Sequence, residues 1–275
     1  MGILPLILGA SIGASTPVVH PVPIRTRAPD HPALWVVNDG DTIIYMFGTF
    51  HALDGKSKWF DQAVKTAFSQ SDELMLETLV PKPQPARAAK TPPSVAAAQP
   101  NATMARLAPS ASFLATTKVV MSAGRSKGLS TDRGADAVLR DAADDSGKPV
   151  KGLESFQFQM NMFSSLPPSP PAAAGASDVQ SARLLGAVLS QLESAWNRGE
   201  VEQAFTPLLM QMRAQSPETY KTMFIDRNVR WANWIVQRLK TPGTVFVAVG
   251  AGHLSGPDSV QSQLASLGVK SARIN

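Results

Sequence analysis

Two histidines occupy matching positions near the two ends of this 275-residue chain. Residues 42–51 read TIIYMFGTFH and residues 244–253 read TVFVAVGAGH, so each apolar run breaks at a glycine that precedes a histidine by three residues. The β-branched and aromatic composition of both runs predicts buried strands. Loops at strand ends often carry the chemistry of α/β proteins, because the sheet fixes the side chain and the loop exposes it. We therefore expect His51 and His253 to act together at one site.

The glycine before each histidine, Gly48 or Gly250, has no Cβ, so the backbone can turn sharply there or approach a ligand closely. Paired histidines can bind a divalent cation, or act as a general base and an electrophile. The other two histidines, His20 and His31, lie in a proline-rich segment, where a structural or exposed role is the simpler interpretation.

Two glutamates also end short apolar runs: Glu77 in the sequence LMLE and Glu154 in VKGLE. A carboxylate at a strand end can ligate a metal or activate water. It can equally well sit near the N-terminus of the next helix, and the pattern alone leaves both roles open. Arg227 and Asn228 lie in a helical stretch, where a solvated polar face is the simpler interpretation.

The composition excludes several kinds of site. The chain has no cysteine, which rules out disulfides, thiolate zinc sites and cysteine nucleophiles, so a metal would need His, Asp or Glu. The net charge is +5, but no basic run or basic stripe with interleaved aromatics accompanies it, so we expect no nucleic-acid partner. Motifs for nucleotide binding, α/β-hydrolases and classical zincins are missing.

The N-terminal residues 1–15 resemble a signal peptide. Residues 3–15 form an uncharged apolar stretch that ends in small residues and is too short for a permanent transmembrane helix. We expect export to the periplasm or secretion, with a mature chain that begins between Ala14 and Val18. The basic residues that usually precede such a stretch are missing, and a disordered or core-packing tail is the alternative.

The remaining chain predicts an extended lead-in over residues 16–31 and a single domain over residues 32–275, with a Pro/Ala-rich insertion at 81–103. Strands are predicted at residues 33–37, 42–47, 74–76, 148–154, from 244 to the glycine at 250, and at 269–274. The Asp-Gly pair at 39–40 predicts that the first two strands form a hairpin. Helices are predicted at residues 59–69, 104–123, 134–143, 156–163, 179–197, 201–216, 217–239 and 260–267. This order predicts an α/β fold, or alternatively α+β, whose central mixed sheet is formed by N- and C-terminal segments around a helical middle region.

Five short stretches carry a resemblance to a known family. They are PALW at 32–35, FGTFHAL at 47–53, DELMLE at 72–77, DRN at 226–228 with Trp231, and VGAGHLSG at 249–256. In this combination and order the chain resembles the TraB/GumN family, which is related to the Tiki proteases. The resemblance extends from about residue 32 to the C-terminus.

The resemblance implies an α/β fold with a central mixed sheet, two Gly-x-x-His motifs that meet at one site and, from the Tiki relatives, divalent-metal-dependent proteolysis. It also implies a set of site residues on this chain. The set comprises His51, Glu77, His253 and Glu154 as catalytic residues, Arg227, Asn228, Gly48 and Gly250 for substrate binding, and His51, His253 and Glu77 as metal ligands.

The leading hypothesis is an exported metal-dependent hydrolase, a peptidase, whose Mn²⁺, Co²⁺ or Zn²⁺ ion lowers the pKa of a bound water. A peptide or another small substrate is the expected partner. Two alternatives remain: a metal-free hydrolase with a histidine base, which more distantly similar erythromycin-esterase-like proteins suggest, and a non-catalytic envelope protein that binds a peptide or polysaccharide. Glu77 is expected beside His51, since strands joined by one crossover helix often lie side by side.

Overall fold

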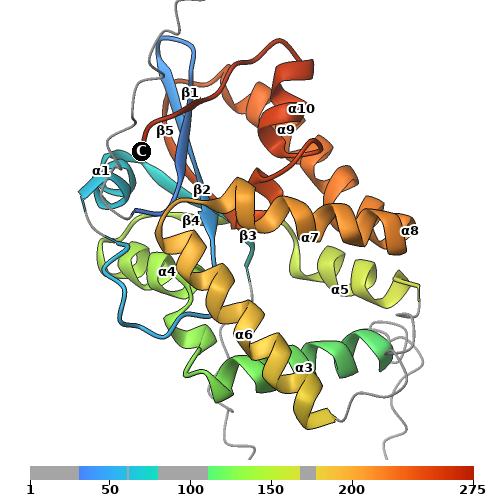
Figure 1. The fold of residues 1–275 in the computed structure, drawn as a ribbon. Coiled ribbons are helices and arrows are strands. Elements are labelled where there is room, and N and C mark those ends of the chain that lie inside the picture. The colour runs from blue at the N-terminus through green and yellow to red at the C-terminus, as the bar shows by residue number, and fades with distance from the viewer. Residues whose placement is uncertain (1–30, 61, 80–110, 168–177) are drawn as a thin grey trace, which may run out of the picture.

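The computed structural model describes residues 31–60, 62–79, 111–167 and 178–275. Its centre is a six-stranded mixed sheet in the order β4-β3-β5-β2-β1-β6 (Figure 1), which confirms the predicted α/β fold. The strands are β1 (Leu34–Asn38), β2 (Thr42–Thr49), β3 (Glu73–Thr78), β4 (Val150–Glu154), β5 (Gly243–Gly250) and β6 (Ala272–Arg273). The predicted signal peptide and the insertion at 81–103 lie outside the described residues.

The first two strands form the expected hairpin. β1 and β2 pair antiparallel, with Leu34 opposite Phe47. The turn between them depends on Gly40, whose φ of +107° is a conformation that other residues rarely adopt. The side chain of Asn38 accepts a hydrogen bond from the Gly40 backbone N–H at 3.1 Å and closes the turn.

Four neighbouring strands, β4, β3, β5 and β2, run parallel. Residues 245–250 of β5 are all buried, as expected for a parallel strand covered on both faces. β2 and β5 are direct neighbours with Thr49 opposite Gly250, so the two Gly-x-x-His motifs leave the sheet side by side, as predicted.

The prediction that the strand of Glu77 lies beside the strand of His51 is wrong. β3 pairs with β5 and not with β2, so the strand of His253 separates Glu77 from the strand of His51. β2 already has β1 on one side through the hairpin, and the long apolar strand β5 takes the other side. β3 therefore joins the sheet one position further out.

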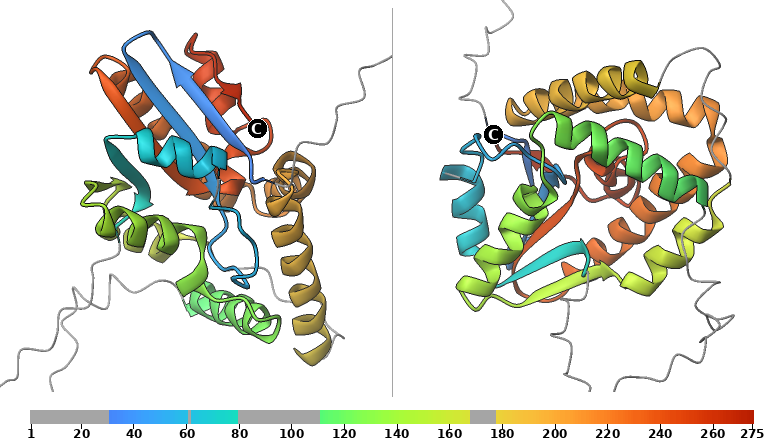
Figure 2. Two further views of the ribbon diagram at one scale, coloured as in Figure 1. Left: turned by 90° about the vertical axis from the view of Figure 1, so that its left-hand side faces the viewer. Right: turned by 90° about the horizontal axis from the view of Figure 1, so that it is seen from below.

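Helices cover both faces of the sheet and gather beyond one end of it (Figure 2). The helices and helical turns are α1 (Gln62–Gln70), α3 (Ala111–Ser126), η1 (Thr131–Arg133), α4 (Ala135–Asp145), α5 (Phe156–Ser165), α6 (Asp178–Asn197), α7 (Val201–Gln215), α8 (Pro217–Tyr220), η2 (Lys221–Ile225), α9 (Asp226–Arg238), η3 (Ala251–Leu254) and α10 (Val260–Ser266). α1 lies on one face of the sheet and α9 with α10 on the other, while α3, α5, α6 and α7 surround the end where the strands deliver the site residues.

The structure departs in one respect from the single long helix predicted over 217–239. Its second segment, η2, is a turn of π-helix between α8 and α9. Such turns widen the helix locally and are often found at functional sites. None of the helices in the described part of the chain is long and apolar enough to cross a membrane.

Candidate functional site

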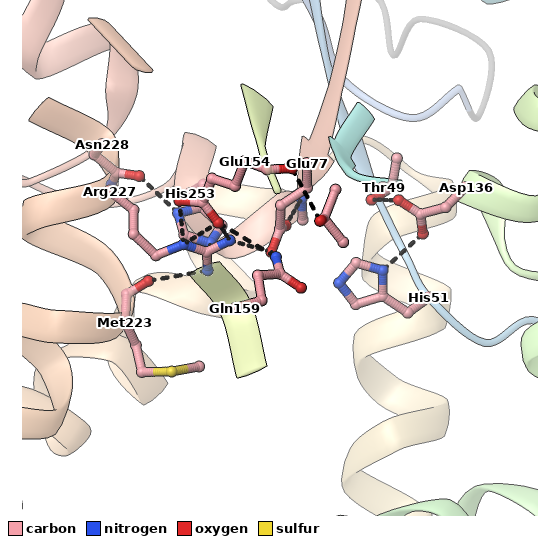
Figure 3. A network of polar contacts seen from close by, with 12 residues as sticks. Thr49, His51, Glu77, Asp136, Glu154, Gln159, Met223, Arg227, Asn228 and His253 are labelled. Atoms are coloured by element: carbon pink, nitrogen blue, oxygen red, sulfur yellow. Dashed lines mark hydrogen bonds and ion pairs between the residues drawn. The ribbon is translucent and has the colours of Figure 1, made fainter. Parts of the chain in front are cut away.

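Four parallel strands deliver the site at their carboxyl ends. His51 follows β2 by two residues, Glu77 is the penultimate residue of β3, Glu154 is the last residue of β4, and His253 lies in η3 directly after β5. Helix α9 adds Arg227 from its first turn. Figure 3 shows Glu77 between the Arg227–His253 pair on one side and His51 on the other.

The guanidinium of Arg227 lies at the centre of the buried part of the site. Its side chain is 2% exposed. Nε lies 3.0 and 3.1 Å from the two carboxylate oxygens of Glu154, and Nη2 lies 2.8 Å from Glu154 Oε2 and also contacts Glu77 Oε1. Nη1 donates to the backbone oxygen of Met223 at 3.3 Å, within the π-helical turn. A buried cation is tolerated only when its N–H groups are paired in this way.

His253 is held as a neutral ring. Its Nε2 lies 3.2 Å from Arg227 Nη1, which can only donate, so Nε2 carries the lone pair and Nδ1 the hydrogen. Nδ1 donates to Asn228 Oδ1 at 2.6 Å, and Asn228 Nδ2 donates to the backbone oxygen of Asp258 at 2.7 Å. Burial lowers the pKa of His253 to about 3.

Two aromatic rings complete the surroundings of His253. The ring centroids of Phe224 and Trp231 lie 4.9 and 4.5 Å from the centroid of the imidazole. His253 is only 5% exposed as a result. Its ring is therefore packed inside the protein rather than opening into a cleft beside His51.

Glu77 is a fixed anion. Oε1 contacts Arg227 and accepts a hydrogen bond from Gln159 Nε2 at 3.1 Å, while Oε2 accepts one from the Gly250 backbone N–H at 3.3 Å. Burial alone would raise the pKa of Glu77, but the charge and hydrogen bond of Arg227 and the nearby protonated His51 outweigh it and lower the pKa to about 2. Glu77 therefore carries its charge across the neutral pH range.

His51 is the exposed member of the site. Its side chain is 63% exposed, and its Nδ1 lies 2.6 Å from Asp136 Oδ2 in the first turn of α4. Thr49 Oγ1 donates to the other oxygen of Asp136 at 2.8 Å, so the carboxylate is fixed on both sides. The charge of Asp136 raises the pKa of His51 to about 9, although the removal of water works against it.

The sequence before α4 places Asp136 under the imidazole. The backbone N–H of Ala135 donates to the oxygen of Phe50 at 2.9 Å and ties the start of α4 to the end of β2. At Gly134, an added Cβ would lie 2.1 Å from the backbone oxygen of His51, so only glycine permits this approach.

The two glycines of the repeated motif have different structural roles. A Cβ at Gly48 would lie 3.1 Å from the Cα of Ala251, so Gly48 lets η3 pack against β2. A Cβ at Gly250 would lie 3.2 Å from His51 Nε2 and 3.6 Å from Glu77 Oε2. His51 Nε2 and Glu77 Oε2 thus both lie close to the point above Gly250, and a side chain at residue 250 would crowd them.

A cavity of about 430 Å³ lies beside His51 and Glu77. Its walls combine charged and apolar side chains from β3, α4, α5 and the loop after β2. They include His51, Leu76, Glu77, Asp136, Arg140, Gln159 and Phe163. His253, Glu154, Arg227 and Asn228 are not among its lining residues and lie buried behind Glu77. Arg227 and Asn228, expected to bind substrate, therefore hold Glu77 and His253 in place in this arrangement.

The expected metal ligands, His51, His253 and Glu77, are not grouped around one point. Across the described ranges, no three His, Cys, Asp or Glu side chains are arranged so that they could hold a metal ion. The lone pair of His253 faces the guanidinium of Arg227, and the same guanidinium neutralises Glu77. Because a positive charge already occupies the space between these donors, the arrangement does not fit a divalent cation.

Sequence reasoning missed Asp136 and Gln159. Asp136 lies in a predicted helix with no motif around it, and only the approach of α4 to the loop after β2 brings it to His51. Gln159 follows Glu154 by five residues, which places it one helical turn into α5. The one available signal is Ser155, directly before the helix predicted at 156–163; its side chain caps α5 by accepting from the Phe158 backbone N–H.

The family resemblance is borne out by comparison with known families. The model of the TraB/PrgY/gumN family matches the chain over residues 33–113 and 86–273. These two segments contain every site residue described above. No curated protein and no solved structure matches the chain.

Proposed function

The chain belongs to the TraB/PrgY/gumN family, and we propose that it is a hydrolase of peptide bonds in which His51 moves the proton without a metal ion. The observation that carries the proposal is the contact between His51 Nδ1 and Asp136 Oδ2 at 2.6 Å, on an imidazole that lines a cavity. A carboxylate on one ring nitrogen fixes the tautomer and directs the other nitrogen towards the substrate.

The attacking water would lie above Gly250, between His51 Nε2 and Glu77 Oε2. His51 takes one proton of this water as general base, and the ionised Glu77 accepts a hydrogen bond from the other O–H. The oxygen attacks the scissile carbonyl carbon, the C–N bond breaks, and the imidazolium returns its proton to the leaving amine. Buried Arg227 keeps Glu77 charged and oriented through this cycle.

The charges around the site favour this assignment over the metal-dependent hypothesis. A metal would have to displace Arg227 from Glu77 and from His253, which would leave a buried guanidinium without partners at high cost. The imidazole of His51 needs no such rearrangement, because its Nε2 already faces the point above Gly250.

The proposal also places the enzyme outside the cytoplasm. The apolar stretch at residues 3–15 supports this, and mass spectrometry of the native protein would find a chain that begins between Ala14 and Val18. A native chain that keeps Met1 in the cytoplasm would contradict export without affecting the proposed chemistry.

A peptidase screen with fluorescence-quenched peptides tests the function. We expect cleavage by the purified chain to survive a chelator and to be lost in His51→Ala, while His31→Ala, a histidine outside the site, keeps full activity. Glu77→Gln should lower turnover at least about a hundredfold, the scale of one acid–base contribution, and Glu154→Gln, which lies behind the cavity, should cost less.

Three outcomes would contradict the proposal in different ways. Loss of activity with the chelator and recovery with Mn²⁺, Co²⁺ or Zn²⁺ would restore the metal-dependent hypothesis. Full activity of His51→Ala would remove the proposed base. Tight binding of a peptide without turnover, unchanged by His51→Ala, would indicate a non-catalytic binding protein.

A further inference from the structure

Gln159 connects the buried carboxylates to the cavity. The residue is 7% exposed, yet it is part of the cavity wall next to His51 and Glu77. Its Nε2 donates to Glu77 Oε1 at 3.1 Å and to Glu154 Oε2 at 3.3 Å. One side-chain amide thus uses both of its N–H groups on two glutamates that end neighbouring strands.

These contacts fix the orientation of the amide. Ionised carboxylates can only accept hydrogen bonds, so the NH₂ end must face Glu77 and Glu154. Reversing the amide would place its oxygen against carboxylate oxygens, which is repulsive. The amide oxygen Oε1 therefore points away from both glutamates, and Figure 3 shows it turned towards the side of His51.

No donor from the described part of the chain reaches Gln159 Oε1. The cavity wall includes Phe163 and Leu76, whose side chains have no polar hydrogen, beside donors on Thr78, Thr131 and Arg140. A carbonyl oxygen with two lone pairs is thus held in a fixed direction at the edge of the proposed reaction centre. A ligand that supplies an N–H or O–H group can pair with this acceptor in place of solvent.

We propose that Gln159 Oε1 binds a backbone N–H of the substrate, so that the site selects peptides with a secondary amide at this position. This inference rests on the proposed peptide hydrolysis. Glutamine suits the task because its donor end is held by the charges that also orient Glu77. The residue therefore positions the substrate relative to the same carboxylate that orients the water.

An N-methyl scan of a peptide that the enzyme cleaves tests this directly. Each backbone amide is methylated in turn, which removes its N–H and keeps its carbonyl. For the wild-type chain we expect one position at which methylation lowers kcat/KM by tenfold to a hundredfold, on the scale of one hydrogen bond to an otherwise unpaired acceptor.

The variant Gln159→Met lacks the acceptor. Its kcat/KM values for the N–H and the N-methyl peptide should therefore have a ratio close to one, whatever its overall rate. Gln157→Met is the matched control, since Gln157 lies on the same helix but bonds Asn161 on the exposed side. If Gln159→Met does not fold, Gln159→Asn replaces it; its shorter stem withdraws the oxygen and should also reduce the ratio.

The outcomes separate the two proposals. A peptide that His51→Ala fails to cleave, but whose N-methyl ratio is the same in wild type and in the Gln159 variant, overturns the inference and leaves the proposed function standing. A scan in which no methylation affects the wild type also overturns it. If the wild-type chain cleaves no peptide at all, both proposals fail together.

Discussion

Replacing Asp136 by asparagine isolates the charge that acts on His51. Asparagine has the same size, and its oxygen can still accept a hydrogen bond from Thr49 or from the imidazole. The native carboxylate raises the pKa of His51 from 6.5 to about 9. Without that charge we expect the pKa in Asp136→Asn to fall by about two units towards 6.5, because the charge of Asp136 is the largest cause of the shift.

The same change has a calculable effect on stability. A pKa raised in the folded state adds stability that is fully present below pH 6.5 and is lost as the pH rises through about 9. At about 1.4 kcal/mol per pKa unit the shift corresponds to roughly 3 kcal/mol. The imidazole is 63% exposed, so solvent screening reduces this to about 1 kcal/mol. Asp136→Asn should therefore cost about 1 kcal/mol at pH 6 and almost nothing at pH 10.

NMR titration of the histidine ring protons measures the pKa, and the spectrum of His51→Ala identifies the resonance. Asp141→Asn, an exposed acid on the same helix, is the control and should leave the titration unchanged. The rising limb of kcat/KM, which reports the free general base, should move from about pH 9 in the native enzyme towards 6.5 in Asp136→Asn. A native His51 that titrates near 6.5, or one that Asp136→Asn does not change, would refute the reasoning.

Three further predictions follow from the same geometry. Gly250→Ala should lower turnover at least about tenfold with the fold intact, since the new Cβ would lie 3.2 Å from His51 Nε2 and crowd the water proposed between His51 and Glu77. Unchanged turnover with normal circular dichroism would argue against that position of the water. Gly134→Ala should lower the free energy of unfolding by about 2–3 kcal/mol in denaturant titration, because its Cβ would meet the backbone of the loop after β2. The control Gly124→Ala should be neutral or stabilising, because Gly124 lies inside a helix and its Cβ would meet only side chains, at 3.7 Å or more. Because burial lowers the pKa of His253 to about 3, the free energy of unfolding should fall as the pH drops from 6.5 towards 3, by up to about 1.4 kcal/mol per pH unit. A melting temperature that does not change over this pH range would contradict the burial of His253.

The strands were predictable because their signals are local. Residues 43–48 and 245–250 are continuous apolar runs that end in glycine, and such runs are typical of parallel strands covered on both faces. The hairpin turn at Gly40 was equally clear from the Asp-Gly pair. What the runs could not specify is their order in the sheet, because pairing depends on which edges other strands have already filled.

The site was predictable only where its residues belong to motifs. The repeated Gly-x-x-His phrase identified His51 and His253, and the family resemblance added Arg227. Their different surroundings were not predictable: His51 is exposed, while His253 is buried by rings from η2 and α9. For Arg227, a solvated helix face was the simpler interpretation of the pattern, and burial against two carboxylates that are distant from it in sequence overrides it.

Arg227 determines which group in this site can exchange protons. Glu77 and Glu154 end neighbouring parallel strands and would repel each other, and the guanidinium between them compensates both charges. As a result Glu77, with a pKa of about 2, remains an anion, while burial keeps His253, with a pKa of about 3, neutral. Between these values and the pKa of about 9 at His51, the charges of these three groups are constant. Of these three groups only His51 changes its protonation above neutral pH, and it is also the histidine that the fold exposes to the cavity.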